Sequence, residues 1–417
     1  MTKILNITQR YHPAKGGAEQ FVQILSEYLV NTKRYDVDVW STDALGADTL
    51  WDLGNDVIDV KEEIINGVNV KRFPIGKGIL RNKYLNKVYR VVFGSLPFFK
   101  ISNLASCPTS FDMLDAIKSI KGYDFVTVSS TPYYFLFYVG YLISKKLNIP
   151  LILIPAFHIG IEKNDSLKKK YFKKTAIPFF KHASKIILNT KAEGEAIKDF
   201  CKENGVDIED EKLVVIGQGV FLEKIKGGDG KRFRSKYNIQ NDIVFQIGSK
   251  NVDKGSINLI EAMIKCWDRG IDSTLVFGGG YNRDFTEYIS RLDGKYRERI
   301  LNIDNISEED KWDLYDAGDI FSMVSKTDSF GIVYLESWVY GKPVLGCNNV
   351  AIREVIKDSK EGYLLDFDDI EGIGEKIEYL LKNDSLREEM GDMGKKKVLE
   401  RYNWEKNLEK VGGIYKK

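Results

Sequence analysis

The chain has few of the residues that build metal centres and disulfide frameworks. Its 417 residues include 3 histidines and 4 cysteines. The cysteines are far apart and form no Cys-x-x-Cys pair, so neither a zinc site nor a disulfide framework is expected, and a reducing cytoplasm is the simplest location. With so few histidines, a metal site built from several of them is nearly excluded. We therefore expect no metal and no cofactor.

Long hydrophobic runs are also missing. The longest apolar stretch extends from Tyr133 to Ile143, well short of the about 20 residues that span a bilayer. The N-terminus becomes polar before the core of a signal peptide could form. The net charge of +2 argues neither for nor against nucleic acid. No nucleic-acid partner is expected. The sequence thus predicts a protein that is not integral to a membrane.

Acidic residues are absent from one long segment, residues 64–111. Cations interleaved with aromatic and aliphatic residues occur there: Lys71, Arg72, Lys77, Arg81, Lys83, Lys87, Arg90 and Lys100. Residues 168–185 are likewise basic and aromatic. Such segments suit docking on anionic lipid headgroups at the inner face of a membrane. A solvated helix face, or a basic groove for an anionic acceptor, would have the same composition.

Strand and helix patterns alternate along the chain, and its length exceeds the usual size of one core. A first series has expected strands at 3–8, 37–41, 125–129, 151–154, 186–189 and 213–216, with helices at 18–31, 133–147 and 191–204. A second has strands at 243–247, 273–277, 320–323 and 343–346, with helices at 256–269 and 331–340. This order predicts two α/β, doubly wound domains that face each other across a cleft. The Gly- and Lys-rich segment 224–236 is interpreted as a hinge or linker between them.

The most informative stretch, TDSFGIVYLESWVYGKPVLG, extends from Thr327 to Gly346. It contains two carboxylates, Asp328 and Glu336, eight positions apart. Between them, Ser-Phe-Gly leads into an apolar run that begins like a helix. Free backbone N–H groups and the positive end of the helix dipole bind phosphate at such a turn. A phosphate between two carboxylates that bind hydroxyls indicates a nucleotide sugar.

Three other positions could contact a ligand. Gly16-Gly17 follows the first expected strand and is either a tight turn or a close approach to phosphate. Lys250 and Lys254 lie in the loop GSKNVDKG after another strand, which is either a phosphate site or a solvated basic loop. His158 follows the strand at 151–154 and could bind a hydroxyl or act as a base, although a single histidine is usually structural.

Two shorter motifs argue against other chemistries. The Gly16-Gly17 turn is not a Gly-x-Gly-x-x-Gly fingerprint, and no acidic residue ends the second strand in the expected manner, so a nicotinamide enzyme is disfavoured. Asp36-Val-Asp38 matches Asp-x-Asp in letters. Because it flanks a predicted strand, we interpret it as structural.

Together these motifs resemble the retaining family-4 glycosyltransferases, which have the GT-B fold of two Rossmann-like domains. The matching segments are YHPAKGGAEQFVQILSEYL, VVIGQGVFLEK, GSKNVDKGSINLIEAM, VFGGG, the block from NISEEDKW to KPVLG, and RYNWEKNLEKVGGIY. They occur in the family's order and cover nearly the whole length. The resemblance implies an N-terminal acceptor-side domain at 1–215, a donor-binding domain at 216–399, and a last helix at 400–417 that packs back on the first domain.

The resemblance also implies roles for single residues. Glu336 would bind the ribose hydroxyls and Asp328 the donor sugar, while Lys254 would neutralise the diphosphate and His158 would lie near the transferred sugar. Backbone groups of four residues would face the sugar and phosphate: Phe330, Gly331, Ile332 and Val333. Gly16 and Gly17 would border the phosphate and the acceptor.

The chain departs from the family pattern at three positions. Asp328 replaces the usual Glu and is one methylene shorter. Ser249 stands where Arg is common, with Lys250 as the expected substitute, and Gln218 replaces the usual Asn.

The implied reaction is metal-independent, retaining transfer of a sugar from a nucleotide diphosphate to an acceptor hydroxyl, such as a lipid-linked or cell-envelope glycan. A nucleotide-sugar epimerase of the same fold and a non-catalytic sugar-nucleotide-binding protein are the alternatives.

Overall fold

The computed structural model describes residues 1–14, 16–52, 54, 56–76, 78–129, 131–157, 159–160, 171–225 and 227–416. The chain divides into two compact units. Unit 1 comprises residues 1–157, 165–216 and 408–417, and unit 2 comprises 158–164 and 217–407. From the sequence, the boundary between the two domains is expected between residues 215 and 216, and the return to the first domain between residues 399 and 400. The chain therefore leaves unit 1 and returns to it near its C-terminus.

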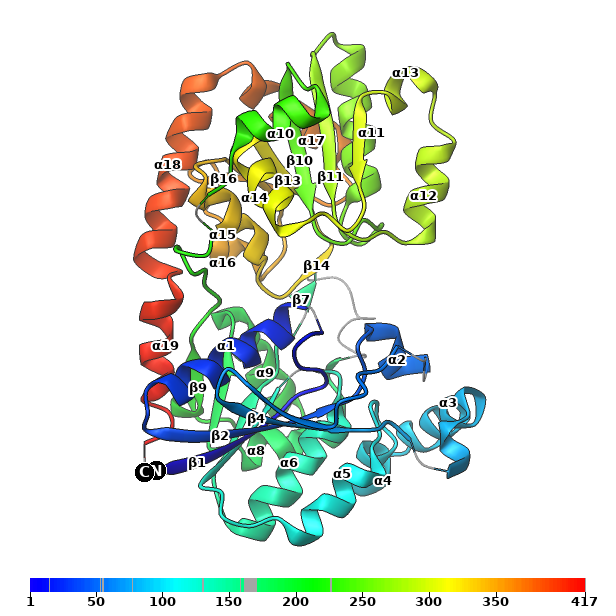
Figure 1. The fold of residues 1–417 in the computed structure, drawn as a ribbon, viewed down its shortest axis with the longest axis vertical. Helices are drawn as coiled ribbons and strands as arrows, with labels where there is room; N and C mark the ends of the chain where they lie inside the picture. Colours follow the sequence, from blue (N-terminus) through cyan, green and yellow to red (C-terminus); the bar gives the residue numbers. More distant parts are fainter. Residues whose placement is uncertain are drawn as a thin grey trace. The chain divides into compact units, whose positions relative to one another are not determined.

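Unit 1 is built on an eight-stranded sheet with the order β3-β4-β2-β1-β5-β6-β8-β9 (Figure 1). The strands are β1 (Thr2–Ile7), β2 (Tyr35–Thr42), β3 (Glu62–Ile65), β4 (Val68–Phe73), β5 (Phe125–Ser129), β6 (Leu151–Ile154), β8 (Lys185–Leu188) and β9 (Leu213–Val215). All neighbouring pairs are parallel except β3 with β4. Buried parallel strands need apolar residues on both faces, and β5 and β6 are buried along their whole length.

Helices connect these strands. They are α1 (Gly17–Asn31), α2 (Ala47–Asp52), α3 (Lys83–Gly94), α4 (Phe99–Leu104), α5 (Phe111–Ala116), α6 (Tyr134–Leu147), α8 (Ile177–His182) and α9 (Lys191–Glu203), with the 3₁₀ turn η1 (Gly78–Arg81) before α3. The longest apolar run of the sequence forms α6, whose side chains from Tyr134 to Val139 are all buried. Its hydrophobicity thus reflects a helix enclosed within a core. No helix in the described ranges is long and apolar enough to cross a membrane.

The C-terminal residues complete the core of unit 1. Tyr415 is 1% exposed, and its hydroxyl lies 2.9 Å from that of Thr127 in β5. Its ring contacts Tyr35 and Phe125 edge-on. These contacts attach the last residues of the chain to the central strands of the N-terminal sheet.

Unit 2 is built on a six-stranded, wholly parallel sheet with the order β12-β11-β10-β13-β15-β16. Its strands are β10 (Asp242–Ile247), β11 (Ser273–Gly278), β12 (Ile300–Ile303), β13 (Ile320–Met323), β15 (Val344–Cys347) and β16 (Gly362–Leu365). A separate antiparallel pair joins β7 (Ile159–Gly160) to β14 (Thr327–Asp328). The α/β, doubly wound class expected from the sequence is confirmed in both units.

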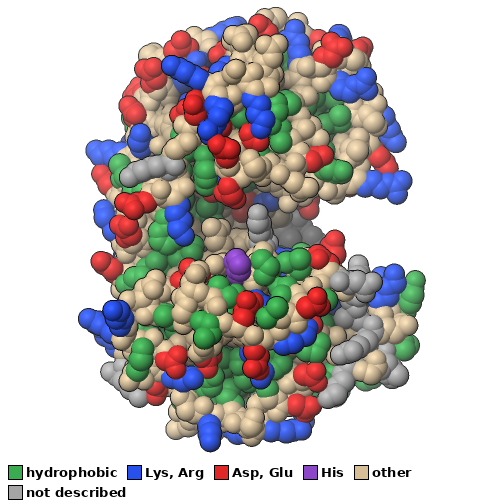
Figure 2. Space-filling model, viewed as in Figure 1, with side chains coloured by type: hydrophobic (Ala, Val, Ile, Leu, Met, Phe, Trp, Pro, Cys, Tyr) green, Lys and Arg blue, Asp and Glu red, His purple; other side chains and the backbone are tan. Residues whose placement is uncertain are grey.

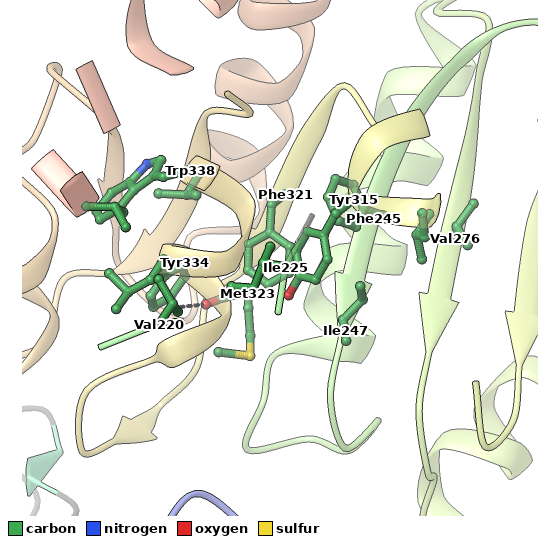
Figure 3. Close-up of a cluster of buried hydrophobic side chains, with 14 of the residues drawn as sticks. Val220, Ile225, Phe245, Ile247, Val276, Tyr315, Phe321, Met323, Tyr334 and Trp338 are labelled. Carbon is green, nitrogen blue, oxygen red and sulfur yellow. Dashed lines mark hydrogen bonds between the residues drawn. The ribbon is translucent and has the colours of Figure 1, made fainter. Parts of the chain in front are cut away.

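The helices of unit 2 pack on both faces of this sheet (Figure 1). They are α10 (Gly230–Tyr237), α11 (Ser256–Asp268), α12 (Arg283–Ser290), α13 (Gly294–Arg297), α14 (Glu308–Ala317), α15 (Ile332–Val339), α16 (Ile352–Val355), α17 (Ile370–Leu381) and α18 (Asp384–Arg401). Helix α19 (Trp404–Gly412) follows them and contains the return to unit 1. One face is filled by aromatic residues that include Phe245, Phe321 and Tyr334 (Figure 3). The Tyr334 hydroxyl donates to the carbonyl of Met323 at 2.6 Å. This bond joins α15 to the end of β13.

The prediction of a linker at 224–236 is wrong for most of that segment. Residues 230–237 form α10, which begins after Asp229, whose side chain accepts the Arg232 N–H. Phe233 is fully buried, and Arg232 pairs with the buried carboxylate of Asp313 at 2.6 Å. The polar composition hid this helix because few of its side chains are apolar: Phe233 is buried in the core, and Tyr237 packs against the same core.

Candidate functional site

The topology of unit 2 determines which loops meet. From β10 the chain proceeds outward through β11 and β12, and then returns to place β13 on the other side of β10. The strand order therefore reverses between β10 and β13. In open parallel sheets, ligands bind at the carboxyl ends of the strands at such a reversal. The two loops at that point are 248–255 and 324–331, and both were singled out from the sequence.

An ion pair joins these two loops. The Lys254 ammonium lies 2.9 Å from Oδ2 of Asp328, and the side chains are 26% and 10% exposed. The Asp328 carboxylate also accepts the N–H of Ser329 at 2.9 Å through Oδ1. Two of the predicted site residues, from separate sequence motifs, are thus brought into direct contact at the edge of the sheet.

Backbone contacts hold the loops at this separation. The Lys326 N–H donates to the Asp253 carbonyl at 2.8 Å, and the Ser325 hydroxyl contacts the same carbonyl at 3.3 Å. Gly255 has a φ of 71°, and a Cβ there would lie 2.4 Å from the carbonyl oxygen of Val324. A residue without a side chain is therefore needed where the second loop crosses the start of α11.

The N-terminus of α15 lies next in the chain after Asp328. Gly331 precedes the helix with a φ of 84°, and a Cβ there would lie 2.3 Å from the Tyr334 ring. Phe330 is buried with its ring against Tyr402, whereas Ile332 and Val333 are partly exposed. The first N–H groups of a helix have no acceptor within the helix. This turn can therefore offer backbone N–H groups and the positive end of its dipole to a phosphate.

Glu336 lies one turn further into α15 and is 9% exposed. Its Oε1 lies 2.8 Å from the Lys311 ammonium, and its Oε2 accepts the Tyr315 hydroxyl at 2.7 Å. Burial, together with the Glu336 charge, raises the pKa of Tyr315 well above its ordinary value. Tyr315 therefore remains a hydrogen-bond donor. A carboxylate offers about four lone-pair sites, so Glu336 can still accept hydroxyl groups.

Lys250 does not take part in the Lys254–Asp328 pair. Its side chain is fully buried, and its ammonium lies 2.6 Å from both Asn302 Oδ1 and Asp304 Oδ1. Burial lowers the pKa of Lys250, and the contact with Asp304 opposes that effect. The structure thus directs this lysine into contacts between strand ends and leaves its neighbour Ser249 exposed.

In unit 1, Gly16 and Gly17 lie at the start of α1, after the loop that follows β1. Arg10 pairs with Glu19 beneath this turn at 2.6 Å, with both side chains largely buried. A Cβ on Gly16 would lie 2.2 Å from the Glu19 carboxylate. The turn is therefore packed on a buried ion pair, while its backbone remains exposed. His158, the other predicted site residue of the N-terminal half, lies outside the described residues.

Lys311, Tyr315, Arg10 and Glu19 did not emerge from the sequence as site residues. Lys311 and Tyr315 are four positions apart in α14, a spacing that places both side chains on one face of a helix. That spacing was the available signal, but it does not show that α14 faces α15. The pairing of Arg10 with Glu19 depends likewise on the turn between β1 and α1. By contrast, Asp36 and Asp38 both lie close to the Lys3 ammonium, as expected for a structural role.

The geometry combines three chemical capacities in unit 2. Lys254 and the start of α15 can neutralise a phosphate, Asp328 can accept a hydrogen bond beside it, and Glu336 can accept further hydroxyl groups along the same helix. These groups suit an elongated ligand with a charged centre and hydroxyl groups toward its ends.

Known proteins resemble the chain over the region that contains these residues. Residues 229–397 match the model of the family described as glycosyl transferases group 1. Over its full length the chain is 23% identical to an uncharacterised glycosyltransferase of Methanocaldococcus jannaschii, of which it covers 98%. The matched region contains α10, both loops at the sheet reversal, and the whole of α15.

Solved structures share the fold. A sucrose-phosphate synthase of Thermosynechococcus elongatus superposes with a TM-score of 0.72 at 17% identity, covering 100% of this chain and 98% of that one. HepE of Anabaena, in a complex with UDP, gives the same score and identity over 99% of both chains. The chain is therefore similar to the glycosyl transferases group 1 family over residues 229–397, and it shares the GT-B fold of these solved structures over nearly its whole length.

Proposed function

We propose that the protein transfers a sugar from a nucleotide diphosphate donor to an acceptor hydroxyl, with retention of configuration at the anomeric carbon. The observation that carries this proposal is the Lys254–Asp328 pair at the sheet reversal, followed along the chain by the start of α15 and by Glu336. HepE, which has this fold, is described in complexes with UDP and with UDP-glucose. A nucleotide sugar has a diphosphate between two hydroxyl-bearing groups, which fits this order of functional groups.

Each group takes one role in this proposal. Lys254 and the N–H groups at the start of α15 bind the diphosphate, Asp328 binds a hydroxyl of the donor sugar, and Glu336 binds the ribose. His158 acts near the transferred sugar, and the Gly16-Gly17 backbone borders the acceptor. Because Asp328 already contacts Lys254, the pair fixes the position of the sugar relative to the phosphate. A carboxylate one methylene shorter than Glu would then change which sugar fits.

The bond changes follow from this placement. The bond between the anomeric carbon and the phosphate oxygen breaks as the acceptor oxygen forms its bond to the same face of that carbon. The acceptor proton passes to the departing phosphate oxygen. The negative charge that develops on the diphosphate is stabilised by Lys254 and the α15 dipole. We propose that these groups provide the neutralisation without a metal ion.

The acceptor that we propose is a lipid-linked or cell-envelope glycan, used by a cytoplasmic enzyme at the inner face of the cell membrane. Support comes from the basic and apolar character of residues 64–111. An anionic acceptor carried on a lipid would be concentrated near such a surface.

Lys254→Ala tests the site. We expect at least a tenfold loss of sugar transfer, about 1.4 kcal/mol of transition-state stabilisation, because a charge-assisted contact to the leaving group is removed. A thermal-shift screen with nucleotide sugars would first identify the donor, since a ligand that binds the folded state stabilises it. Transfer of radiolabelled sugar to a lipid extract then measures the rate.

The matched control is Lys265→Ala. Lys265 belongs to α11, the helix that begins just after Lys254, but it pairs with Glu371 at the surface, so turnover should be unchanged. Equal rates for wild type and Lys254→Ala would remove Lys254 from the site. Turnover of the donor to an epimeric sugar without acceptor would instead indicate an epimerase, and binding without turnover a sugar-nucleotide-binding protein.

A further inference from the structure

Helix α3 of unit 1 presents an apolar face to solvent. Tyr84, Leu85, Val88, Val91 and Val92 are 48–69% exposed. Their spacing places them on one side of the helix. Asn86 is the buried residue of α3 on the opposite side. A surface helix of a globular protein normally directs its apolar residues toward the core, so this orientation is inverted.

Cations flank this apolar face. Lys83, Lys87 and Arg90 are spaced four and three residues apart and therefore form one row along α3. Arg90 lies over the ring of Trp51 and donates to the Trp51 carbonyl at 2.5 Å. Within the described ranges none of the three cations forms an ion pair, and residues 64–111 contain no Asp or Glu. No carboxylate in the described part of the chain therefore pairs with this row of cations.

The apolar surface continues beyond α3. The helix packs against η1 and α4, and Phe98 and Ile101 at the start of α4 are 60% and 39% exposed. Figure 1 places α3 at the lower right, and the same region of Figure 2 shows hydrophobic and basic side chains side by side. Aromatic, aliphatic and cationic groups thus share one surface, which we call the α3 surface: Trp51, residues 83–93, Phe98 and Ile101.

A cavity of about 350 Å³ lies beside α3. Four α3 residues line it together with Trp51, Cys107, Pro132 and Lys173, among others. Lys87, Arg90 and Lys173 supply cationic groups, and most of the remaining wall is apolar. Such a cavity suits a phosphate that is esterified to a group with an apolar part, as the phosphate of a phospholipid is.

We propose that the α3 surface docks on an anionic lipid bilayer and that the adjoining cavity receives the phosphate of one lipid headgroup. An exposed apolar stripe flanked by cations is the pattern of a helix that lies in the membrane interface. Charge complementarity favours anionic lipid over a second copy of this surface, since two copies would bring the same uncompensated cations together.

The second basic segment, 168–185, does not provide an equivalent surface in its described part. Phe179 and Phe180 are fully buried in unit 1, so these aromatic rings cannot enter a bilayer. The Lys185 ammonium donates a hydrogen bond to the backbone carbonyl of Glu211. Docking is thereby assigned to α3.

Co-sedimentation with vesicles tests the proposal in the absence of nucleotide sugar, so its outcome is independent of the transfer reaction. Wild-type protein should partition onto phosphatidylcholine vesicles that contain phosphatidylglycerol and only weakly onto pure phosphatidylcholine. Lys83→Gln with Lys87→Gln should weaken partition by about fivefold for each cation. Val88→Glu with Val91→Glu should weaken it by at least about tenfold, because charges would enter the interface.

Matched controls use exposed residues of α18. Lys395→Gln with Lys396→Gln, and Met393→Glu with Leu399→Glu, make the same chemical changes in unit 2. These variants should bind vesicles as wild type does. Circular dichroism and thermal unfolding establish that every variant is folded.

Equal partition of the α3 and α18 variants, or no preference for phosphatidylglycerol, would overturn docking at this surface. Lys173→Gln tests the cavity: it should weaken binding to phosphatidylglycerol vesicles by about fivefold and leave weak binding to phosphatidylcholine unchanged. Competition by soluble glycerol phosphate at matched ionic strength would show a free-phosphate site and overturn the assignment to a bilayer lipid. Elution of the wild type as a dimer that the Val88→Glu, Val91→Glu variant does not form would favour self-association instead.

Discussion

Single residues of the candidate site are held in place before any ligand binds. Glu336 contacts Lys311 and Tyr315, and Asp328 contacts Lys254. A carboxylate fixed by two partners loses little side-chain freedom on binding, which reduces the entropic cost of association. Lys311 and Tyr315 thus orient the group that we assign to the ribose.

Glu336→Gln should weaken binding of the cognate nucleoside diphosphate by about tenfold, because hydrogen bonds to a charged acceptor are worth about 1.5–3 kcal/mol. Calorimetry measures this effect. With the corresponding dideoxynucleoside diphosphate, which lacks the ribose hydroxyls, wild type and variant should bind alike. Glu361→Gln is the control, since Glu361 also belongs to a largely buried pair, with Lys397 at 3.0 Å. A tenfold loss for the dideoxy ligand as well would contradict the ribose role.

At the scale of the elements, hydrogen bonds of buried polar groups connect the start of a helix to the ends of strands. In α9 of unit 1, the Thr190 side chain accepts the N–H of Glu193. The Glu193 carboxylate in turn accepts the N–H groups of Phe157 and Asn189, each at 2.8 Å. Burial raises the pKa of Glu193 to about 7, while these backbone donors oppose the rise. The helix is therefore joined to the ends of β6 and β8 by a carboxyl group that titrates near neutrality.

This pKa predicts a pH dependence of stability. As pH rises from about 4.5, the ordinary value for a glutamate, the unfolded chain releases its proton first, while the folded chain retains it until about pH 7. The contribution of Glu193 to the free energy of unfolding should thus decrease across this window, by up to about 3 kcal/mol. Denaturant titrations of wild type and Glu193→Gln at several pH values should show a difference that changes between pH 4.5 and 7. Glu195→Gln, at an exposed position of the same helix, is the control. Parallel pH profiles of stability for wild type and Glu193→Gln would contradict the prediction.

At the scale of the whole molecule, the two units divide the proposed work. Unit 2 contains the ion pair, the start of α15 and Glu336, all within residues 254–336. Unit 1 contains the Gly16-Gly17 turn and the α3 surface. The chain passes from unit 1 to unit 2 and returns, so neither unit is one continuous segment.

Activity should survive excess EDTA if the protein alone neutralises the diphosphate. The cation and the helix dipole that we assign to this task belong to unit 2, and a chelator leaves both in place. The transfer assay, repeated with EDTA and with added Mg²⁺ or Mn²⁺, provides the measurement. Loss of transfer in EDTA that a metal ion restores would contradict the metal-free proposal.

Much of the fold was predictable because alternating strand and helix patterns arise from local periodicity. Strands β5, β6 and β13 begin and end at the predicted residues. Helix α10 was missed because it buries a single phenylalanine, Phe233. Of the site, the Gly-rich loops and both carboxylates could be found, since turns that bind phosphate have a local signature.

The sequence by itself determined the α/β class, the two loops at the strand ends, and the eight-residue spacing of Asp328 and Glu336, since each depends on neighbours along the chain. Only the tertiary structure decided which cations serve the site. Lys250 and Lys254 are four residues apart, yet one is buried against Asp304 and the other meets Asp328. Likewise, Lys311 reaches Glu336 only through the packing of α14 on the same core as α15. Contacts between distant segments depend on the strand order, and local periodicity does not specify that order.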